Sequence, residues 1–162
     1  MRLVELRVRN YRCYKDEISL RFDDLTAMVG KNDAGKSTIM EALDIFFYDS
    51  GPDKNDANKQ GQANDLAIIG VFSDFPPSIV LDQDAPTSLA AEYLLNADGN
   101  LEIHKIYSGA TSSPKLTTLR LAAIHPTASG ADDLFRLTNA ELKKRAESLK
   151  ADTSKIDKKV NA

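Results

Sequence analysis

The feature that most constrains the fold of this chain is one segment, Gly30-Lys31-Asn32-Asp33-Ala34-Gly35-Lys36-Ser37. It fits the pattern G-x-x-x-x-G-K-[ST] at every fixed position. In such a loop the glycines let the backbone curl, so that successive N–H groups point inward at phosphate oxygens. The lysine ammonium reaches the β- and γ-phosphates, and the serine hydroxyl can bind Mg²⁺. The segment therefore predicts nucleotide binding.

The residues around the loop have the hydrophobic pattern that such a loop requires. Residues 25–29 form a short apolar run that ends at Gly30, which predicts a buried strand. Residues 36–48 place apolar side chains at helical spacing, with acidic side chains between them. The loop is therefore predicted to open a helix, whose N-terminal dipole and free N–H groups favour an anion.

The composition predicts one globular domain. The chain has 162 residues, of which 42% are hydrophobic and 28% are charged, enough to bury a core. The net charge of −3 argues against a general nucleic-acid binder. Cys13 is the only cysteine, which excludes an intramolecular disulfide and a thiolate zinc cluster and favours a reducing compartment. No apolar stretch approaches the roughly 18 to 20 residues of a membrane span, so we expect a cytoplasmic protein.

Strand patterns and turn-forming segments alternate along the rest of the chain. Strands are predicted over residues 2–9, 18–22, 66–72, 91–95, 101–107 and 117–124. Residues 10–14 connect the first two strands, and residues 96–100 turn between the two arms of a hairpin. Residues 138–141 fit the capping box S/T-x-x-E, which predicts a helix start. The chain thus divides into a strand–turn–strand–loop–helix opening over 1–48, a mobile loop over 49–65, a β-rich portion over 66–126 and a helical segment over 133–160.

The opening of the chain resembles a known group of proteins. Residues 6–12 read Leu-Arg-Val-Arg-Asn-Tyr-Arg, and residues 29–43 contain the loop and the start of its helix. These stretches resemble the N-terminal ATPase lobe of ABC-type ATPases that handle DNA, namely the SMC, Rad50 and RecF group and the OLD family of ATP-dependent endonucleases. The loop variant Asn-Asp-Ala-Gly-Lys-Ser-Thr looks most like the OLD family. The strong resemblance covers about residues 1–48.

The resemblance implies an α/β P-loop NTPase fold with a mixed sheet, an antiparallel β portion and a C-terminal helix. The central strand of that sheet would deliver the loop into the helix. By resemblance, Lys36, Ser37 and Thr38 would contact the β/γ-phosphates, the Mg²⁺ and the α-phosphate side respectively. Asn32 matches a residue close to the γ-phosphate, and Arg12 matches a basic residue near the nucleotide, with an ordinary surface arginine as the alternative. The expected ATP-binding residues are Gly30, Asn32, Asp33, Ala34, Gly35, Lys36, Ser37, Thr38 and Arg12, with Ser37 as the Mg²⁺ ligand.

The chain lacks the motifs that complete hydrolysis in those proteins. There is no Leu-Ser-Gly-Gly signature, and no Walker B strand of four apolar residues followed by Asp-Glu. Residues 79–82 are followed by Gln83, and residues 66–72 by Ser73-Asp74, so each is predicted to be a plain strand end. No catalytic residue and no nuclease metal ligand can be assigned. We therefore expect the chain to be the front part of a longer protein.

The predicted function is Mg-ATP binding by the loop half-site of an ABC-type ATPase. The resemblance implies that the parent is an OLD-like ATP-dependent DNA endonuclease in anti-phage defence, which forms a homodimer or a higher oligomer and dimerises in its ATP state. A RecF- or SMC-like DNA-repair ATPase is the alternative within the same group. Two alternatives come from other classes: a nucleotide-sensing or assembly module that does not hydrolyse ATP, and a small phosphotransferase. The strand–turn–strand opening before the loop disfavours the phosphotransferase.

Overall fold

The computed structural model describes residues 1–31, 35–48, 50–61, 65–82, 85–108 and 114–152. The chain divides into two compact units, Met1–Ile124 and His125–Ala162, which are described separately. In the described part of the chain, no helix is both long enough and apolar enough to cross a membrane.

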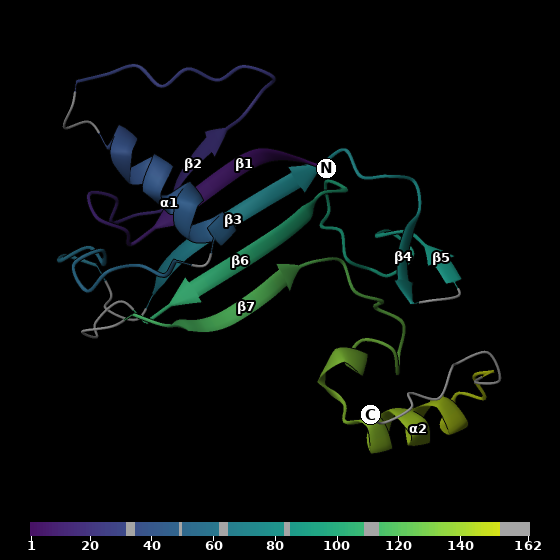
Figure 1. The fold of residues 1–162 in the computed structure, drawn as a ribbon. Helices are drawn as coiled ribbons and strands as arrows, with labels where there is room; N and C mark the ends of the chain where they lie inside the picture. The colour runs from purple at the N-terminus through teal and green to yellow at the C-terminus, as the bar shows by residue number, and fades with distance from the viewer. Residues whose placement is uncertain (32–34, 49, 62–64, 83–84, 109–113, 153–162) are drawn as a thin grey trace. The chain divides into compact units, whose positions relative to one another are not determined.

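The first unit is built on a five-stranded sheet with helix α1 on one face (Figure 1). The strand order is β2-β1-β3-β6-β7, and every neighbouring pair is antiparallel. The elements are β1 Arg2–Arg9, β2 Ile18–Arg21, α1 Lys36–Tyr48, β3 Leu66–Ser73, β6 Leu101–Tyr107 and β7 Leu116–Ala122. The strands predicted over 2–9, 18–22, 66–72, 101–107 and 117–124, and the helix over 36–48, are therefore confirmed within a residue or two.

The core lies between α1 and the face of the sheet that it covers. Alternate residues of the central strands point to this face, as the two-residue period of a strand requires. The core residues from α1 and the two central strands are Leu6, Val8, Ile39, Ala42, Ile45, Phe46, Leu66, Ile68 and Phe72. Gly70 lets the Phe46 ring come close to β3, because a Cβ at this position would lie 2.6 Å from the ring Cζ atom. Burial of these side chains holds the helix, and thereby the end of the phosphate loop, against the sheet.

On the opposite face of the sheet, a charged cluster joins β1 to β6. Arg7 on β1 donates to Glu5 at 2.6 Å and to Glu102 on β6 at 3.1 Å. Glu102 also bonds His104 at 2.8 Å and accepts a hydrogen bond from Asn96 at 2.8 Å. Burial raises the pKa of the Glu102 carboxyl, but its bonds to His104 and Asn96 and the Arg7 charge outweigh this effect. The pKa of Glu102 therefore lies below its usual value.

Glu102→Gln is expected to lower the free energy of unfolding at neutral pH by about 1–2 kcal/mol. The –NH₂ group of the glutamine would face Arg7 or Asn96, which are both donors to the Glu102 carboxylate. Because the folded-state pKa of Glu102 is depressed, its stabilisation is present above the unfolded-state value of about 4.3. It is lost as the pH falls through the folded-state pKa. Urea unfolding of both proteins at a series of pH values measures this, and the variant should lose less stability in acid.

The control is Glu17→Gln, because Glu17 forms a looser pair with Arg9 at 3.6 Å and its side chain is 39% exposed. An exposed pair of this kind contributes little to stability. If Glu102→Gln and Glu17→Gln behave alike across the pH series, the cluster does not stabilise the sheet.

Two predicted strands do not form. Residues 25–29 are an extended segment with Leu25 90% and Val29 93% exposed, and within the described ranges no strand pairs with them. The central strand is β3, so the expectation that a central strand delivers the loop into the helix is wrong. Residues 91–93 form turns and residues 94–95 are irregular, so the predicted hairpin arm is absent; β3 and β7 occupy both edges of β6. The turn over 96–100 does form, with the Asn96 N–H donating to the Asn100 carbonyl at 2.8 Å.

Residues 79–82 belong to a separate two-stranded ribbon. Strand β4 Ile79–Asp82 pairs antiparallel with β5 Ala85–Thr87.

The second unit has two short helical elements within its described residues, joined by turns and irregular segments. It contains the 3-10 turn Leu134–Arg136 and helix α2, Asn139–Ser148. The predicted capping box is confirmed, because the Thr138 hydroxyl accepts from the Glu141 N–H and the Glu141 carboxylate accepts from the Thr138 N–H. Residues 153–160 of the predicted helical segment lie outside the described residues.

Candidate nucleotide-binding site

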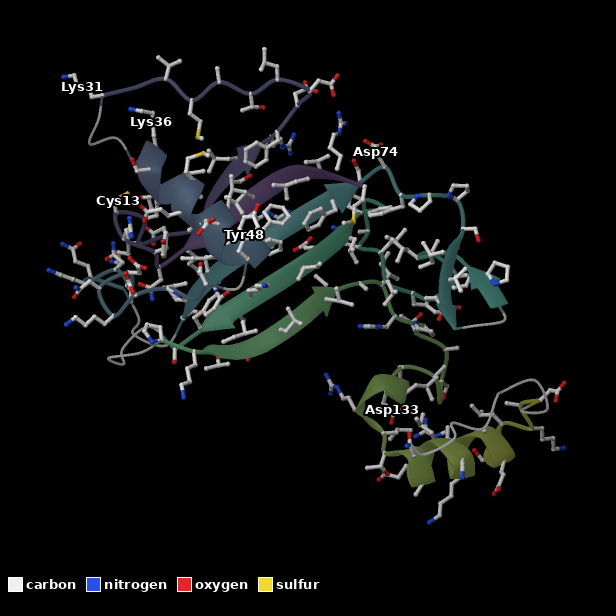
Figure 2. The ribbon with its side chains drawn as sticks, viewed as in Figure 1. Cys13, Lys31, Lys36, Tyr48, Asp74 and Asp133 are labelled. Atoms are coloured by element: carbon white, nitrogen blue, oxygen red, sulfur yellow. The ribbon has the colours of Figure 1, made fainter. Side chains whose placement is uncertain are left out.

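The phosphate loop runs from the extended segment into the first turn of α1. The structure describes its two ends, Gly30-Lys31 and Gly35-Lys36-Ser37, whereas Asn32, Asp33 and Ala34 lie outside the described residues. The Lys36 ammonium donates to the carbonyl oxygens of Gly30 and Lys31, both at 2.5 Å. These bonds place the positive charge of Lys36 at the N-terminal end of α1, where Figure 2 also shows Cys13. The lysine thus links the two ends of the loop.

The start of α1 is suited to an anion. The Gly35 carbonyl accepts the first helical hydrogen bond from the Ile39 N–H at 3.2 Å. The first turn contains no acidic residue, so no carboxylate there opposes a phosphate at the positive end of the helix dipole. Ser37 is exposed in this turn, while Thr38 is only 7% exposed. Of the two hydroxyl residues, Ser37 is the one that a ligand at the surface can reach.

The turn over residues 10–14 packs against the end of the loop. Its ends are closed by two backbone hydrogen bonds between Tyr11 and Tyr14, at 2.8 and 2.9 Å. The Tyr14 hydroxyl donates to the Gly35 carbonyl at 3.5 Å, and the Cys13 thiol lies 4.0 Å from the Thr38 hydroxyl oxygen. The 10–14 turn therefore packs against Gly35 and the first turn of α1.

Arg12 lies in this turn and is held by two carboxylates. Its Nε donates to Asp56 at 2.7 Å, and its Nη1 pairs with Glu41 of α1. Burial lowers the pKa of the Arg12 guanidinium, but the hydrogen bond to Asp56 and the nearby negative charges outweigh this effect and raise it. Arg12 therefore stays charged and is one-third exposed, with two of its three nitrogens engaged.

Three residues of this region were not predicted from the sequence: Cys13 and Tyr14, which touch the loop, and Asp56, which holds Arg12. The only sequence signal for Asp56 was the run of turn-forming residues in the segment 49–65, which predicted a mobile loop. In the described part of that segment, hydrogen bonds tie residues 53–61 to one another and to the turn.

The described residues offer few metal ligands. They contain no group of three or more His, Cys, Asp or Glu side chains that could hold a metal ion. A magnesium ion commonly takes only one or two protein ligands and fills its other positions with phosphate oxygens and water. The exposed hydroxyl of Ser37 fits that need in part.

Comparison with known proteins agrees with the site. A model of the AAA ATPase domain family matches residues 1–162, and the chain belongs to this family. Membership implies ATP binding. Two relatives fall in the groups that the opening of the chain resembles. An OLD nuclease of Thermus scotoductus is 48% identical over 50 residues, which are 31% of this chain and 9% of that protein.

The second relative is a DNA double-strand break repair Rad50 ATPase of Archaeoglobus fulgidus. It is 29% identical over 106 residues, which are 61% of this chain and 12% of that protein. The matched part of the chain therefore spans only about a tenth of the length of either relative.

Proposed function

We propose that this chain binds Mg-ATP through the phosphate loop and the first turn of α1. The observation that carries the proposal is the Lys36 ammonium, fixed by the Gly30 and Lys31 carbonyls at a helix N-terminus without acidic residues. An ammonium at this place would pair with the β- and γ-phosphates. The proposed ATP-binding residues are Gly30, Asn32, Asp33, Ala34, Gly35, Lys36, Ser37, Thr38 and Arg12.

In this proposal Ser37 is the protein's ligand to Mg²⁺. When bound, the ion would neutralise part of the phosphate charge. Thr38 would contribute mainly through its backbone N–H, since its side chain is buried against Cys13.

The parent protein that we favour is an OLD-like ATP-dependent DNA endonuclease that acts in anti-phage defence. The 48% identity to an OLD nuclease over 50 residues supports this choice. A RecF- or SMC-like DNA-repair ATPase is the second candidate, supported by the longer match to a Rad50 ATPase. In either protein we expect dimerisation in the ATP state, because the signature motif absent from this sequence acts across a dimer.

Isothermal titration of the full chain with ATP tests the proposal, with Mg²⁺ and with excess EDTA. We expect saturable binding that is weaker in EDTA, and a smaller effect of Mg²⁺ in Ser37→Ala. Phosphate release should be slow, because the sequence contains no Walker B Asp-Glu pair. Failure to bind Mg-ATP would refute the proposal. Fast turnover that requires Lys36 would show that the chain contains a catalytic base.

A further inference from the structure

A loop far from the phosphate loop in sequence is joined to it through the 10–14 turn. Arg12 is the centre of this connection. Its backbone N–H donates to the Asp56 carbonyl at 2.6 Å, and its Nε donates to the Asp56 carboxylate at 2.7 Å. The Asn58 side chain donates to the Arg12 carbonyl at 2.6 Å. Backbone and side chain of Arg12 are thus both held by the loop over residues 53–61.

Asp56 is a buried carboxylate with both oxygens in use. The residue is 5% exposed. One carboxylate oxygen accepts from the Arg12 Nε, and the other accepts from the Asp53 N–H at 2.6 Å. Because an unpaired buried carboxylate is unfavourable, these two donors hold Asp56 in a single orientation.

The other side of the same turn touches the nucleotide-binding elements. Tyr14 bonds the Gly35 carbonyl, Cys13 faces Thr38, and Arg12 pairs with Glu41 on α1. A displacement of the turn would therefore move the groups against which Gly35 and the first turn of α1 are packed.

We propose that Asp56 is a positioning residue for nucleotide binding, which acts through Arg12 and the 10–14 turn to hold Gly35 and the first turn of α1 in place for the phosphates. The inference rests on the proposed function. A phosphate is bound by several backbone N–H groups at once, so the loop must be ordered before binding or become ordered during it. In this proposal Asp56 holds Gly35 and the first turn of α1 in place before the nucleotide binds. Without Asp56, part of the binding free energy would be used to order these residues, and the affinity would fall.

Asp56→Asn tests the inference because the amide keeps the size of the carboxylate and removes one acceptor. Its –NH₂ group must face either the Arg12 Nε–H or the Asp53 N–H, and both are donors. We expect Mg-ATP affinity to fall about tenfold, which corresponds to roughly 1.4 kcal/mol. Removal of a negative charge near an anionic ligand would by itself strengthen binding. A weaker affinity of Asp56→Asn is therefore explained by lost positioning and not by the lost charge.

The matched control is Asp53→Asn. Asp53 lies in the same loop, its side chain is exposed, and only its backbone joins the connection. This variant removes the same charge and leaves the Arg12 bonds intact, so its affinity should not fall. Thermal melts show whether each variant is folded at the titration temperature, which separates positioning from loss of stability.

Cys13 provides a local readout, because its thiol lies in the turn, is exposed and faces Thr38. Its alkylation by iodoacetamide can be followed by peptide mass spectrometry. In the wild-type chain we expect Mg-ATP to slow alkylation. In Asp56→Asn we expect faster alkylation without nucleotide and weaker protection with it.

The inference is overturned if folded Asp56→Asn binds Mg-ATP as tightly as wild type and Cys13 reacts at the wild-type rate. If Asp56→Asn does not fold, Asn58→Ala decides, because it releases the Arg12 carbonyl without an unpaired buried charge. Unchanged affinity and alkylation in that variant would also overturn the inference. Failure of the proposed function looks different, since the wild-type chain itself would then bind no Mg-ATP.

Discussion

Lys36→Ala is expected to weaken Mg-ATP binding by about 100-fold or more. An ammonium that reaches both the β- and γ-phosphates makes two charge-assisted hydrogen bonds, worth roughly 3 kcal/mol together. The same side chain bonds the Gly30 and Lys31 carbonyls, so its loss also removes a link between the two ends of the loop. Lys36→Ala therefore removes the contact with the phosphates and also the bonds that join Lys36 to the Gly30 and Lys31 carbonyls.

Titration calorimetry of wild type and variant, with a thermal melt of each, measures the effect. The control is Lys31→Ala, which removes an equal charge from an exposed side chain of the same loop. A general attraction between basic residues and ATP predicts similar losses in both variants. The phosphate-loop assignment predicts a large loss in Lys36→Ala and a small one in Lys31→Ala. If Lys36→Ala binds Mg-ATP normally while folded, the assignment is wrong.

The elements that the sequence predicted are those whose signal is local. The period of two in β1 and the period of 3.6 in α1 are properties of neighbouring residues, and both elements form where expected. The capping box at Thr138 is likewise contained in four residues. The family resemblance was also carried by one continuous stretch, the opening that contains the loop.

The wrong predictions concern strands whose existence depends on a partner. Residues 25–29 are apolar enough for a buried strand, but a strand also needs a neighbour for its backbone N–H and C=O groups. In the described sheet, β1 lies between β2 and β3 and does not pair with this segment. Residues 91–95 fail for the same reason, because both edges of β6 are occupied.

The connection below the phosphate loop was beyond prediction because its partners are distant in the chain. Arg12 and Asp56 are 44 positions apart, and the composition of the segment that contains Asp56 does not indicate that it contacts Arg12. The sequence placed Arg12 close to the nucleotide only by resemblance. The structure adds that two carboxylates determine where its guanidinium lies.

Gly35→Ala is expected to damage the site through two separate effects. Gly35 has a φ of +82°, a left-handed conformation that costs about 1–2 kcal/mol for a residue with a Cβ. A Cβ here would also lie 2.3 Å from the Tyr14 hydroxyl oxygen and 3.1 Å from the Cys13 sulfur. The Tyr14 side chain, the turn or the start of α1 must shift, at a cost typical of overpacking, about 1–3 kcal/mol. We therefore expect Gly35→Ala to lose both stability and Mg-ATP affinity. Urea unfolding measures the first loss and titration calorimetry the second.

Gly51→Ala separates these two effects. Gly51 has a similar φ of +71°, but nothing lies within 4 Å of a Cβ built there. This variant should show the backbone cost alone, with unchanged Mg-ATP affinity. Tyr14→Phe combined with Gly35→Ala should recover part of the loss, because it removes the hydroxyl that the new methyl group would meet. If Gly35→Ala loses no more stability and Mg-ATP affinity than Gly51→Ala, the 10–14 turn does not pack tightly against Gly35. The proposed effect of Asp56 on nucleotide binding would then lack this contact.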